Sequence, residues 1–179
     1  MSIADEAAAH VNNLLRDVAD FPQTGVIFKD LTPVLADGPA LRAVTDAIVA
    51  HHGGPRAFDV VAGVEARGFV LGAAVAYAAG VGIVPLRKAG KLPREVHAAT
   101  YDLEYGEATL EVHTDAFQPG MRALVIDDVL ATGGTLGAAV SLVERAGAVV
   151  AGISVVLELS FLHGRERMAA RDINALVVV

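Results

Sequence analysis

The segment Ala123–Thr135, with the sequence ALVIDDVLATGGT, constrains the fold of this chain more than any other stretch. It begins with a short apolar run, Ala123–Ile126, which is rich in β-branched residues and too short for a helix, so we expect a buried strand. Residues 136–146 have the apolar periodicity of a helix, and Thr135 is its expected N-cap. The segment therefore predicts a strand, a tight turn and a helix in direct succession.

The turn between this strand and helix has the composition of a phosphate-binding loop. Ala131–Thr135 contains two consecutive glycines, which let backbone N–H groups come close to a ligand. The N-terminus of the helix adds partial positive charge, and Thr132 and Thr135 add hydroxyl groups. The carboxylates of Asp127 and Asp128 would repel a phosphate, but they are good acceptors for the vicinal hydroxyls of a ribose. The segment therefore predicts a site for a sugar phosphate.

This pattern resembles the phosphoribosyl-pyrophosphate (PRPP) signature of the type I phosphoribosyltransferases, in which hydrophobic residues and two acidic residues precede a TGGT-like turn. The match is unbroken over the 13 residues of the segment. The alternative is an ordinary strand–turn–helix with a threonine cap and two turn glycines, which a bare Gly-Gly-Thr would indicate. The acidic pair and the strand before it favour the signature.

Length and composition favour one domain with an α/β core. The chain has 179 residues, of which 54% are hydrophobic and only 5% aromatic, so Ala, Val, Leu and Ile must fill the core. The absence of cysteine excludes disulfides, thiolate catalysis and zinc–thiolate sites. The net charge of −7 argues against general nucleic-acid binding, which requires a basic face. The opening MSIADEAAAH lacks the pattern of a secretory signal, so we expect a cytoplasmic protein.

Apolar periodicity, glycine and proline predict alternating helices and strands, and hence a doubly wound, mostly parallel central sheet flanked by helices. The uncharged run Phe69–Leu86 has the minimum length of a membrane span, but two glycines and a proline interrupt it, and no membrane association is expected. The expected helices lie at residues 2–18, at Pro39–His52, between Gly68 and Ala79, and at Arg165–Arg171; the expected strands lie at Asp59–Gly63, Val81–Leu86, Ala148–Leu157 and Ala175–Val179.

Two further stretches are predicted to be irregular. Phe21–Leu35 is unusually apolar for a loop, so it either packs on the core or covers an apolar ligand. Residues 87–107 combine charges, Gly and Pro with two strand-like ends, Thr100–Leu103 and Thr109–Val112. This composition predicts a mobile loop with an antiparallel hairpin, and such loops often close over a reactive intermediate.

Three of the expected strands are followed by charged residues, and ligands bind at the carboxyl ends of the strands in such sheets. The basic residues here suit a pyrophosphate, although a solvated basic surface loop is the alternative. The histidines show no metal-ligand spacing, so none is assigned as a metal ligand. The charged strand ends are Glu65-Ala66-Arg67, Arg87-Lys88 and Asp127-Asp128, and the cationic group is Arg67, Arg87, Lys88, Lys91 and Arg94.

Five blocks of this sequence resemble the adenine phosphoribosyltransferases in content and order: FPQTGVIFKDLTPVL, GVEARGF, RKAGKLP, LEYG and IDDVLATGGT. The first and fourth blocks distinguish this branch from other type I enzymes. The departures are slight: Lys29 stands where arginine is also acceptable, and Ala66 where serine is also familiar. The resemblance implies a single domain, 1–179, with an N-terminal helix and base-binding hood (residues 1–35) and a core (residues 36–179) with a flexible loop at about 87–107.

The resemblance also implies how PRPP is bound. The substrate would carry Mg²⁺, because its pyrophosphate needs charge neutralisation, and no metal ligand on the protein is implied. A homodimer is expected, in which Arg87 acts in its own or in the partner subunit. The residues implied are Asp127 and Asp128 for the ribose hydroxyls, Ala131, Thr132, Gly133, Gly134 and Thr135 for the 5′-phosphate, and Arg67, Arg87, Lys88 and Lys91 for the pyrophosphate.

For the base, the resemblance implies contacts from the hood and from the loop. Ile27 and Lys29 would meet adenine through backbone groups, while Phe28 stacks on its ring. Glu104 would handle the proton at adenine N7, and Tyr105 would order the loop. The reaction would convert adenine and PRPP to AMP and pyrophosphate.

Other functions remain open on the sequence alone. The same fold and signature occur in repressors that only sense PRPP, but this sequence shows no added DNA-binding domain and keeps Glu104. A phosphoribosyltransferase for another purine and an interaction module with a vestigial site are the remaining alternatives. The latter would not need the intact cationic loop.

Overall fold

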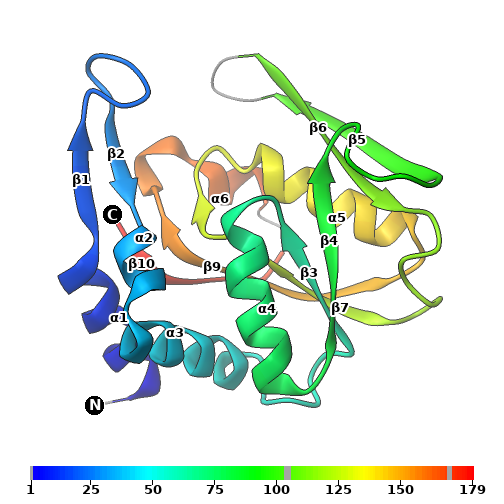
Figure 1. Cartoon of the computed structure of the whole chain (residues 1–179), viewed down its shortest axis with the longest axis horizontal. Coiled ribbons are helices and arrows are strands. Elements are labelled where there is room, and N and C mark those ends of the chain that lie inside the picture. Colours follow the sequence, from blue (N-terminus) through cyan, green and yellow to red (C-terminus); the bar gives the residue numbers. More distant parts are fainter. Residues whose placement is uncertain (1, 103–105, 169–170) are drawn as a thin grey trace.

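The computed structural model of this chain describes residues 2–102, 106–168 and 171–179. Within these residues an eight-stranded sheet forms the centre, and a two-stranded sheet lies near the N-terminus (Figure 1). The strands are β1 (Arg16–Ala19), β2 (Ile27–Asp30), β3 (Val60–Val64), β4 (Gly82–Lys88), β5 (Val96–Asp102), β6 (Glu107–His113), β7 (Arg122–Ile126), β8 (Val129–Leu130), β9 (Val149–Glu158) and β10 (Ile173–Val178). The α-helices are α1 (Ile3–Leu14), α2 (Thr32–Ala36), α3 (Gly38–His51), α4 (Arg67–Ala79), α5 (Gly134–Arg145) and α6 (Gly164–Arg167).

The expected mostly parallel sheet is confirmed. Its strand order is β10-β9-β7-β3-β4-β6-β5, with β8 paired to β9 beside this path. The pairs from β10 to β4 are parallel, whereas β6 is antiparallel to both β4 and β5. The strand predicted from residues 123–126 is therefore β7, an interior strand with parallel neighbours on both sides.

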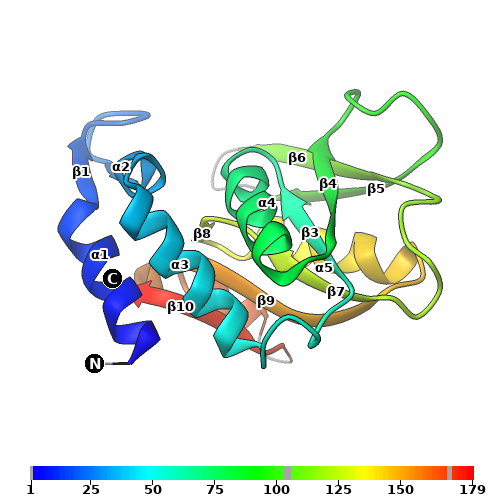
Figure 2. The ribbon, with the colours of Figure 1, turned by 60° about the horizontal axis from the view of Figure 1, so that its bottom comes forward.

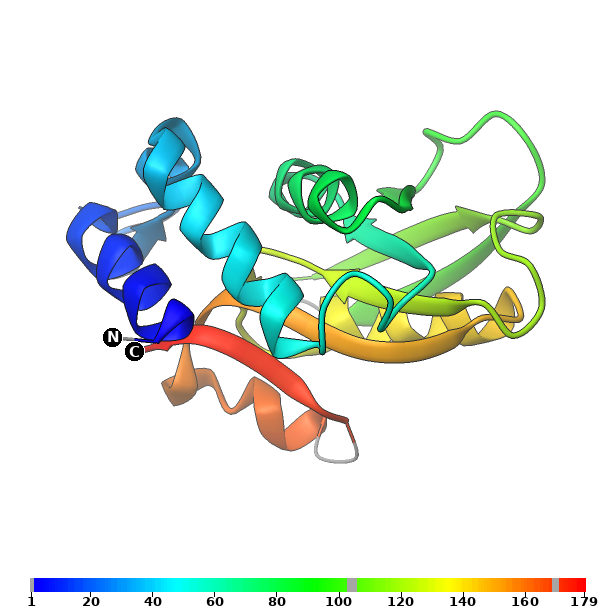
Figure 3. The ribbon, with the colours of Figure 1, turned by 90° about the horizontal axis from the view of Figure 1, so that it is seen from below.

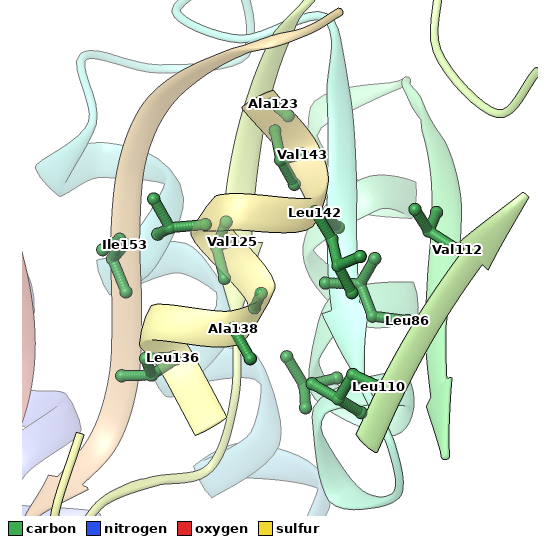
Figure 4. Close-up of a cluster of buried hydrophobic side chains, with 14 of the residues drawn as sticks. Leu86, Leu110, Val112, Ala123, Val125, Leu136, Ala138, Leu142, Val143 and Ile153 are labelled. Carbon is green, nitrogen blue, oxygen red and sulfur yellow. The ribbon is translucent and has the colours of Figure 1, made fainter. Parts of the chain in front are cut away.

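Both faces of the sheet are covered, as the apolar strands require. Successive residues of β7 point to opposite faces, so Ala123 and Val125 pack in the core with α5, while Leu124 and Ile126 pack in the core with α1, α3 and α4. Figures 2 and 3 show α3 and α4 over one face, and Figure 4 shows Leu142 and the other apolar residues of α5 against the opposite face.

The N-terminal helix begins as predicted but ends early. Ser2 Oγ accepts a hydrogen bond from the Asp5 N–H (3.1 Å), and the Asp5 carboxylate accepts one from the Ser2 N–H (2.9 Å), so a capping box starts α1. The prediction that this helix continues to Val18 is wrong, because Leu15 is extended and Val18 lies in β1, where it is 40% exposed. Pairing with β2 determines the conformation of this segment.

The prediction that Phe21–Leu35 is irregular holds for residues 21–26 but is wrong for residues 27–30 and 32–35. Ile27–Asp30 forms β2, which pairs antiparallel with β1 and places Phe28 opposite Val18. Pro33 lies in the first turn of α2, where the missing N–H has no cost. A four-residue strand that depends on a partner eight or more residues away leaves little periodicity in its own sequence.

Two predicted helices differ from the structure at their ends. Thr135 is not the N-cap of α5, because the helix begins at Gly134 and Gly133 takes the cap position with φ of +84°. The last helix, predicted at Arg165–Arg171, is limited to Gly164–Arg167. At the beginning of α5 the difference accompanies a close contact between the Gly133 backbone and Gly164, a residue distant in the sequence.

The remaining elements agree with the predictions to within a few residues. The hairpin expected in residues 87–107 is confirmed and consists of two seven-residue strands, although Leu103 lies outside the described residues and the mobility of the loop stays a prediction. The uncharged run Phe69–Leu86 is divided between α4 and β4. In the described part of the chain, no helix has the length and apolarity needed to cross a membrane.

One half-buried histidine gives the fold a pH dependence. His52, next to α3, lies against Gly152 of β9, and its Nε2 is 2.8 Å from Ser154 Oγ, which also accepts a bond from Asn174 Nδ2 (3.2 Å). Burial is the main cause that lowers the pKa of His52 to about 4, assisted by the charge of His51 and opposed by Asp172.

We therefore expect acid to destabilise the fold through His52. Between its ordinary pKa of 6.5 and about 4, the unfolded chain binds a proton at His52 that the folded chain does not, so stability falls as the pH falls through this range. His52→Gln should lose less stability than wild type in urea titrations at pH 7, 6 and 5. The exposed neighbour gives the control, His51→Gln, which should keep most of the wild-type slope. An unchanged slope in His52→Gln would contradict this explanation.

Candidate functional site

The charged residues predicted at the strand ends meet at one edge of the sheet. β3 is parallel to both β4 and β7, with Val64 beside Leu86 and Gly63 beside Ile126. The residues that follow these positions therefore emerge together. Figure 1 shows the segment after β7 between the β1–β2 hairpin and the β5–β6 hairpin in this view.

Glu65, directly after β3, binds several cationic residues at this edge. Its side chain is 9% exposed and accepts hydrogen bonds from Arg87 Nε (3.3 Å), from the Lys88 backbone N–H (2.9 Å) and from Lys91 Nζ. Burial alone would raise the pKa of Glu65, but the bonds from Lys91 and Lys88 and the charges of Lys91 and Arg87 outweigh burial and lower the pKa to about 2. Glu65 is therefore a carboxylate at any physiological pH.

Glu65 is a site residue to which the sequence alone gave no role, although Glu65-Ala66-Arg67 was predicted to be a charged strand end. The structure brings three of the four residues predicted to bind pyrophosphate onto Glu65, with the Lys88 side chain itself exposed. Arg94 does not join them, because it pairs with Asp115 (2.5 Å) on an exposed surface. The available signal for Glu65 was a lone carboxylate directly after a buried strand and two residues before Arg67.

Arg67, the fourth of these residues, connects the acidic pair to the hood. Its Nε donates to Asp128 Oδ2, and its guanidinium carbon lies 5.9 Å from the centroid of the Phe28 ring. Phe28 in turn packs edge-to-face against Phe21, with a centroid distance of 5.1 Å. The structure therefore places the ring predicted to stack on a base beside the cation that pairs with Asp128.

The two aspartates after β7 have different environments. Asp127 is 7% exposed, and its Oδ1 accepts the backbone N–H of Asp128 (2.9 Å). A Cβ on Gly68 would lie 2.7 Å from the carbonyl oxygen of Ile126 and 3.1 Å from Asp127 Oδ1, so the start of α4 packs directly on this pair. Burial and then the charge of Asp128 raise the pKa of Asp127. Both aspartates are thus buried, and they differ in their partners: Asp127 accepts a backbone N–H, whereas Asp128 pairs with Arg67.

The predicted phosphate turn, Ala131–Thr135, joins β8 to α5. Gly133 adopts a φ of +84°, which a residue with a side chain rarely adopts. The first intrahelical bond runs from the Gly137 N–H to the Gly133 carbonyl (2.9 Å), so the amides of the first turn have no acceptor within the helix. These amides, the helix dipole and the half-buried Thr132 and Thr135 form an arrangement that can bind a phosphate monoester.

The β5–β6 hairpin reaches the same turn. A Cβ on Gly134 would lie 2.6 Å from the carbonyl oxygen of Asp102 and 3.2 Å from the Tyr101 ring. The proposed catalytic residues Glu104 and Tyr105 lie outside the described residues. Asp102, the last described residue before them, lies against the predicted phosphate turn.

The hood presents the expected backbone segment. β2 pairs with β1 alone in the described two-stranded sheet, and backbone groups alternate between the two edges of a strand, so one set of N–H and C=O groups on β2 is available. Lys29 Nζ binds both oxygens of Asp17 (2.7 and 2.9 Å), and Ile27 is 60% exposed. The Lys29 side chain is thus engaged with β1, so the backbone groups of β2 are the part of this residue that remains available to a ligand.

Comparisons with known proteins agree with this geometry. The phosphoribosyl transferase domain family matches residues 32–176. The adenine phosphoribosyltransferase of Salinispora arenicola is 62% identical over 172 residues, which cover 96% of this chain and 91% of that protein. The crystal structure of adenine phosphoribosyltransferase from Thermoanaerobacter pseudethanolicus matches with a TM-score of 0.91 at 44% identity, and covers 96% of this chain and 99% of that one. The Saccharomyces cerevisiae enzyme, crystallised with an imino-altritol bisphosphate and adenine, matches with a TM-score of 0.91 at 36% identity, covering 97% of this chain and 99% of that one.

Proposed function

This chain belongs to the adenine phosphoribosyltransferases, a branch of the phosphoribosyltransferase family, and we infer that it converts adenine and PRPP to AMP and pyrophosphate. The observation that carries this inference is the contact series from Phe28 through Arg67 to Asp128, which joins the ring that we propose stacks on the base to the carboxylate that we propose binds the ribose. The roles of individual residues that follow are proposals built on this geometry.

We propose that PRPP binds with its 5′-phosphate on the turn Ala131–Thr135 and its ribose hydroxyls on the acidic pair. The hydroxyls would compete with Arg67 for Asp128, and the released guanidinium would then be free to bind the pyrophosphate. Asp127 fixes the backbone N–H of Asp128 through one oxygen and would offer the other to the ribose. This arrangement gives two carboxyl groups for the sugar, the amides of a helix N-terminus for the 5′-phosphate and one cationic region for the pyrophosphate.

The departing pyrophosphate would bind to Arg87, Lys88 and Lys91. Loss of pyrophosphate leaves an oxocarbenium-like ribosyl centre, so the protein must stabilise the leaving charge and exclude water. Glu65 holds these cations in place before the charge develops. The β5–β6 hairpin, which lies against Gly134, would exclude water from the same centre.

We propose that Mg²⁺ enters the site with PRPP and neutralises charge on the pyrophosphate oxygens. The donor set fits a substrate-borne ion, because the side chains at that end are cationic and the carboxylate among them, Glu65, is engaged with Arg87 and Lys91. In the residues that the structure describes, no group of three acidic or histidine side chains is placed to hold a metal.

Adenine would stack on Phe28 and bind the open backbone edge at Ile27 and Lys29. A PRPP-sensing regulator or a vestigial module would need no aromatic ring beside the ribose carboxylate, and the contact of Phe28 with Arg67 therefore favours the enzyme. A cytoplasmic location stays a prediction from the sequence.

A second copy of the chain is proposed to cover the exposed apolar face of α4 and β4. Val70, Tyr77 and Ile83 on this face are 49%, 90% and 37% exposed, and no charged residue follows Arg67 in α4. Such a face usually belongs to an interface. Arg87 already binds Glu65 of its own chain, so we propose that it acts within its own subunit.

Tyr77→Lys should dissociate the proposed homodimer, because it places a charge at the centre of the apolar face. Analytical ultracentrifugation at micromolar concentration would show a dimer for wild type and a monomer for the variant. Val149→Lys, at an exposed apolar position on β9 outside this face, is the control and should remain dimeric. A Tyr77→Lys variant that sediments as wild type would rule out this interface.

Glu104→Ala should lower kcat by about 10²- to 10⁴-fold, the usual contribution of a positioned general acid or base, because the proton at adenine N7 would lose its partner. Glu107→Ala removes an exposed carboxylate from β6 and should retain nearly full kcat. The measurement is steady-state AMP formation at saturating substrates. Wild-type kcat in Glu104→Ala would assign another group to this step.

Adenine should be strongly preferred over 6-oxopurines. Its 6-amino donor beside the N1 acceptor matches a backbone C=O beside an N–H, whereas hypoxanthine and guanine reverse this pattern and leave buried groups unpaired. A site built on hydrogen bonds can reject such bases by roughly 10⁴- to 10⁵-fold, while stacking on Phe28 alone would accept any purine. The test is kcat/KM for each base with one PRPP stock. Comparable values for a 6-oxopurine would move the chain to another branch of the family.

A further inference from the structure

The segment after β9 supports the back of the phosphate turn. Gly164, the first residue of α6, is buried, and a Cβ on it would overlap the carbonyl oxygen of Ala131 and lie 2.9 Å from both the Ala131 carbonyl carbon and the Gly133 nitrogen. A Cβ on Gly133 would in turn lie 2.7 Å from the Gly164 carbonyl oxygen. The two backbones are therefore in direct contact, with no side chain between them.

The conformation of Gly164 does not itself require glycine. Its φ lies outside the left-handed region, unlike the φ of +84° at Gly133, and its position in a helix would ordinarily favour alanine. The space taken by Ala131 and Gly133 is therefore the reason that a side chain is excluded at residue 164. This constraint points to the turn rather than to α6.

An ion pair between the half-exposed Arg165 and the buried Glu158 anchors Gly164 to the sheet. Arg165, the next residue, donates from Nε to both oxygens of Glu158 (3.0 Å each), from Nη2 to Oε2 (2.5 Å), and from Nη1 to the Ile173 carbonyl (2.9 Å). The Glu158 side chain is only 7% exposed and ends β9, beside β8, which leads into the turn. The anchor therefore connects the back of the turn to two strands of the central sheet.

We propose that Gly164, held by the Glu158–Arg165 ion pair, is a positioning residue for the 5′-phosphate turn. Gly164 touches no substrate atom in this proposal, which rests on the proposed function of the turn. It fixes the backbone of Ala131–Gly133, so that the amides facing the phosphate need no reorganisation when the ligand arrives. Displacing this backbone by a methyl group should loosen the phosphate site and leave the pyrophosphate site intact.

The test compares Gly164→Ala with Gly137→Ala by calorimetry against ribose 5-phosphate and, separately, pyrophosphate. Gly137 is the matched control, because its Cβ would make an ordinary contact with Met168 Sδ at 3.7 Å. Gly164→Ala should weaken ribose 5-phosphate binding by roughly 10- to 100-fold, the effect of an ångström-scale misplacement, without changing pyrophosphate affinity. In turnover, KM for PRPP should rise far more than kcat falls.

Arg165→Lys gives an independent variant should Gly164→Ala not fold, because lysine keeps the charge but not the forked contact with Glu158. It should weaken ribose 5-phosphate binding less than Gly164→Ala and again leave pyrophosphate affinity unchanged. Unchanged ribose 5-phosphate affinity in a folded variant, or equal loss of both ligands, would overturn the proposal. If wild type formed no AMP but the variants still lost affinity for ribose 5-phosphate and not for pyrophosphate, the proposed function would fail and the positioning role of Gly164 would stand.

Discussion

The parallel pairing of β3 with both β4 and β7 is the constraint on which the site depends. This pairing brings Glu65, Arg87 and Asp127, which are far apart in the sequence, to the same edge of the sheet. The start of α4 packs so tightly on the end of β7 that Gly68 has no room for a side chain beside the Ile126 carbonyl. Because both faces of β3 and β7 are buried, the register of these two strands cannot slip without exposing the core.

At and behind this edge of the sheet, buried carboxylates hold the cationic side chains in position. Glu65 gathers Arg87 and Lys91, Asp128 holds Arg67, and Glu158 holds Arg165. The first two arrangements face the proposed substrate, and the third supports the turn from behind. Because Glu65 holds Arg87 and Lys91 in advance, these two cations need little reorganisation during catalysis, which is the condition under which electrostatic stabilisation is largest. Arg67 differs, because the ribose would first have to displace it from Asp128.

The sequence predicted features that depend on neighbouring residues. The strand, acidic pair and double glycine at 123–135 are local, so β7 and its turn could be located in advance. Three other features depend on partners outside their own segment, and no periodicity in the sequence predicts them. They are the β1–β2 hairpin, the cap of α5 at Gly133 and the contact of Gly164 with Ala131. Glu65 shows the same limit, because its cluster of cations follows from sheet register rather than from spacing along the chain.

A crystal structure of the protein with AMP would test the proposed placement of the nucleotide most directly. We predict that the 5′-phosphate lies on the amides of Ala131–Thr135, that the ribose hydroxyls lie on Asp128, and that the purine stacks on Phe28. A phosphate bound instead at Arg87 and Lys91, or a purine placed away from Phe28, would contradict it.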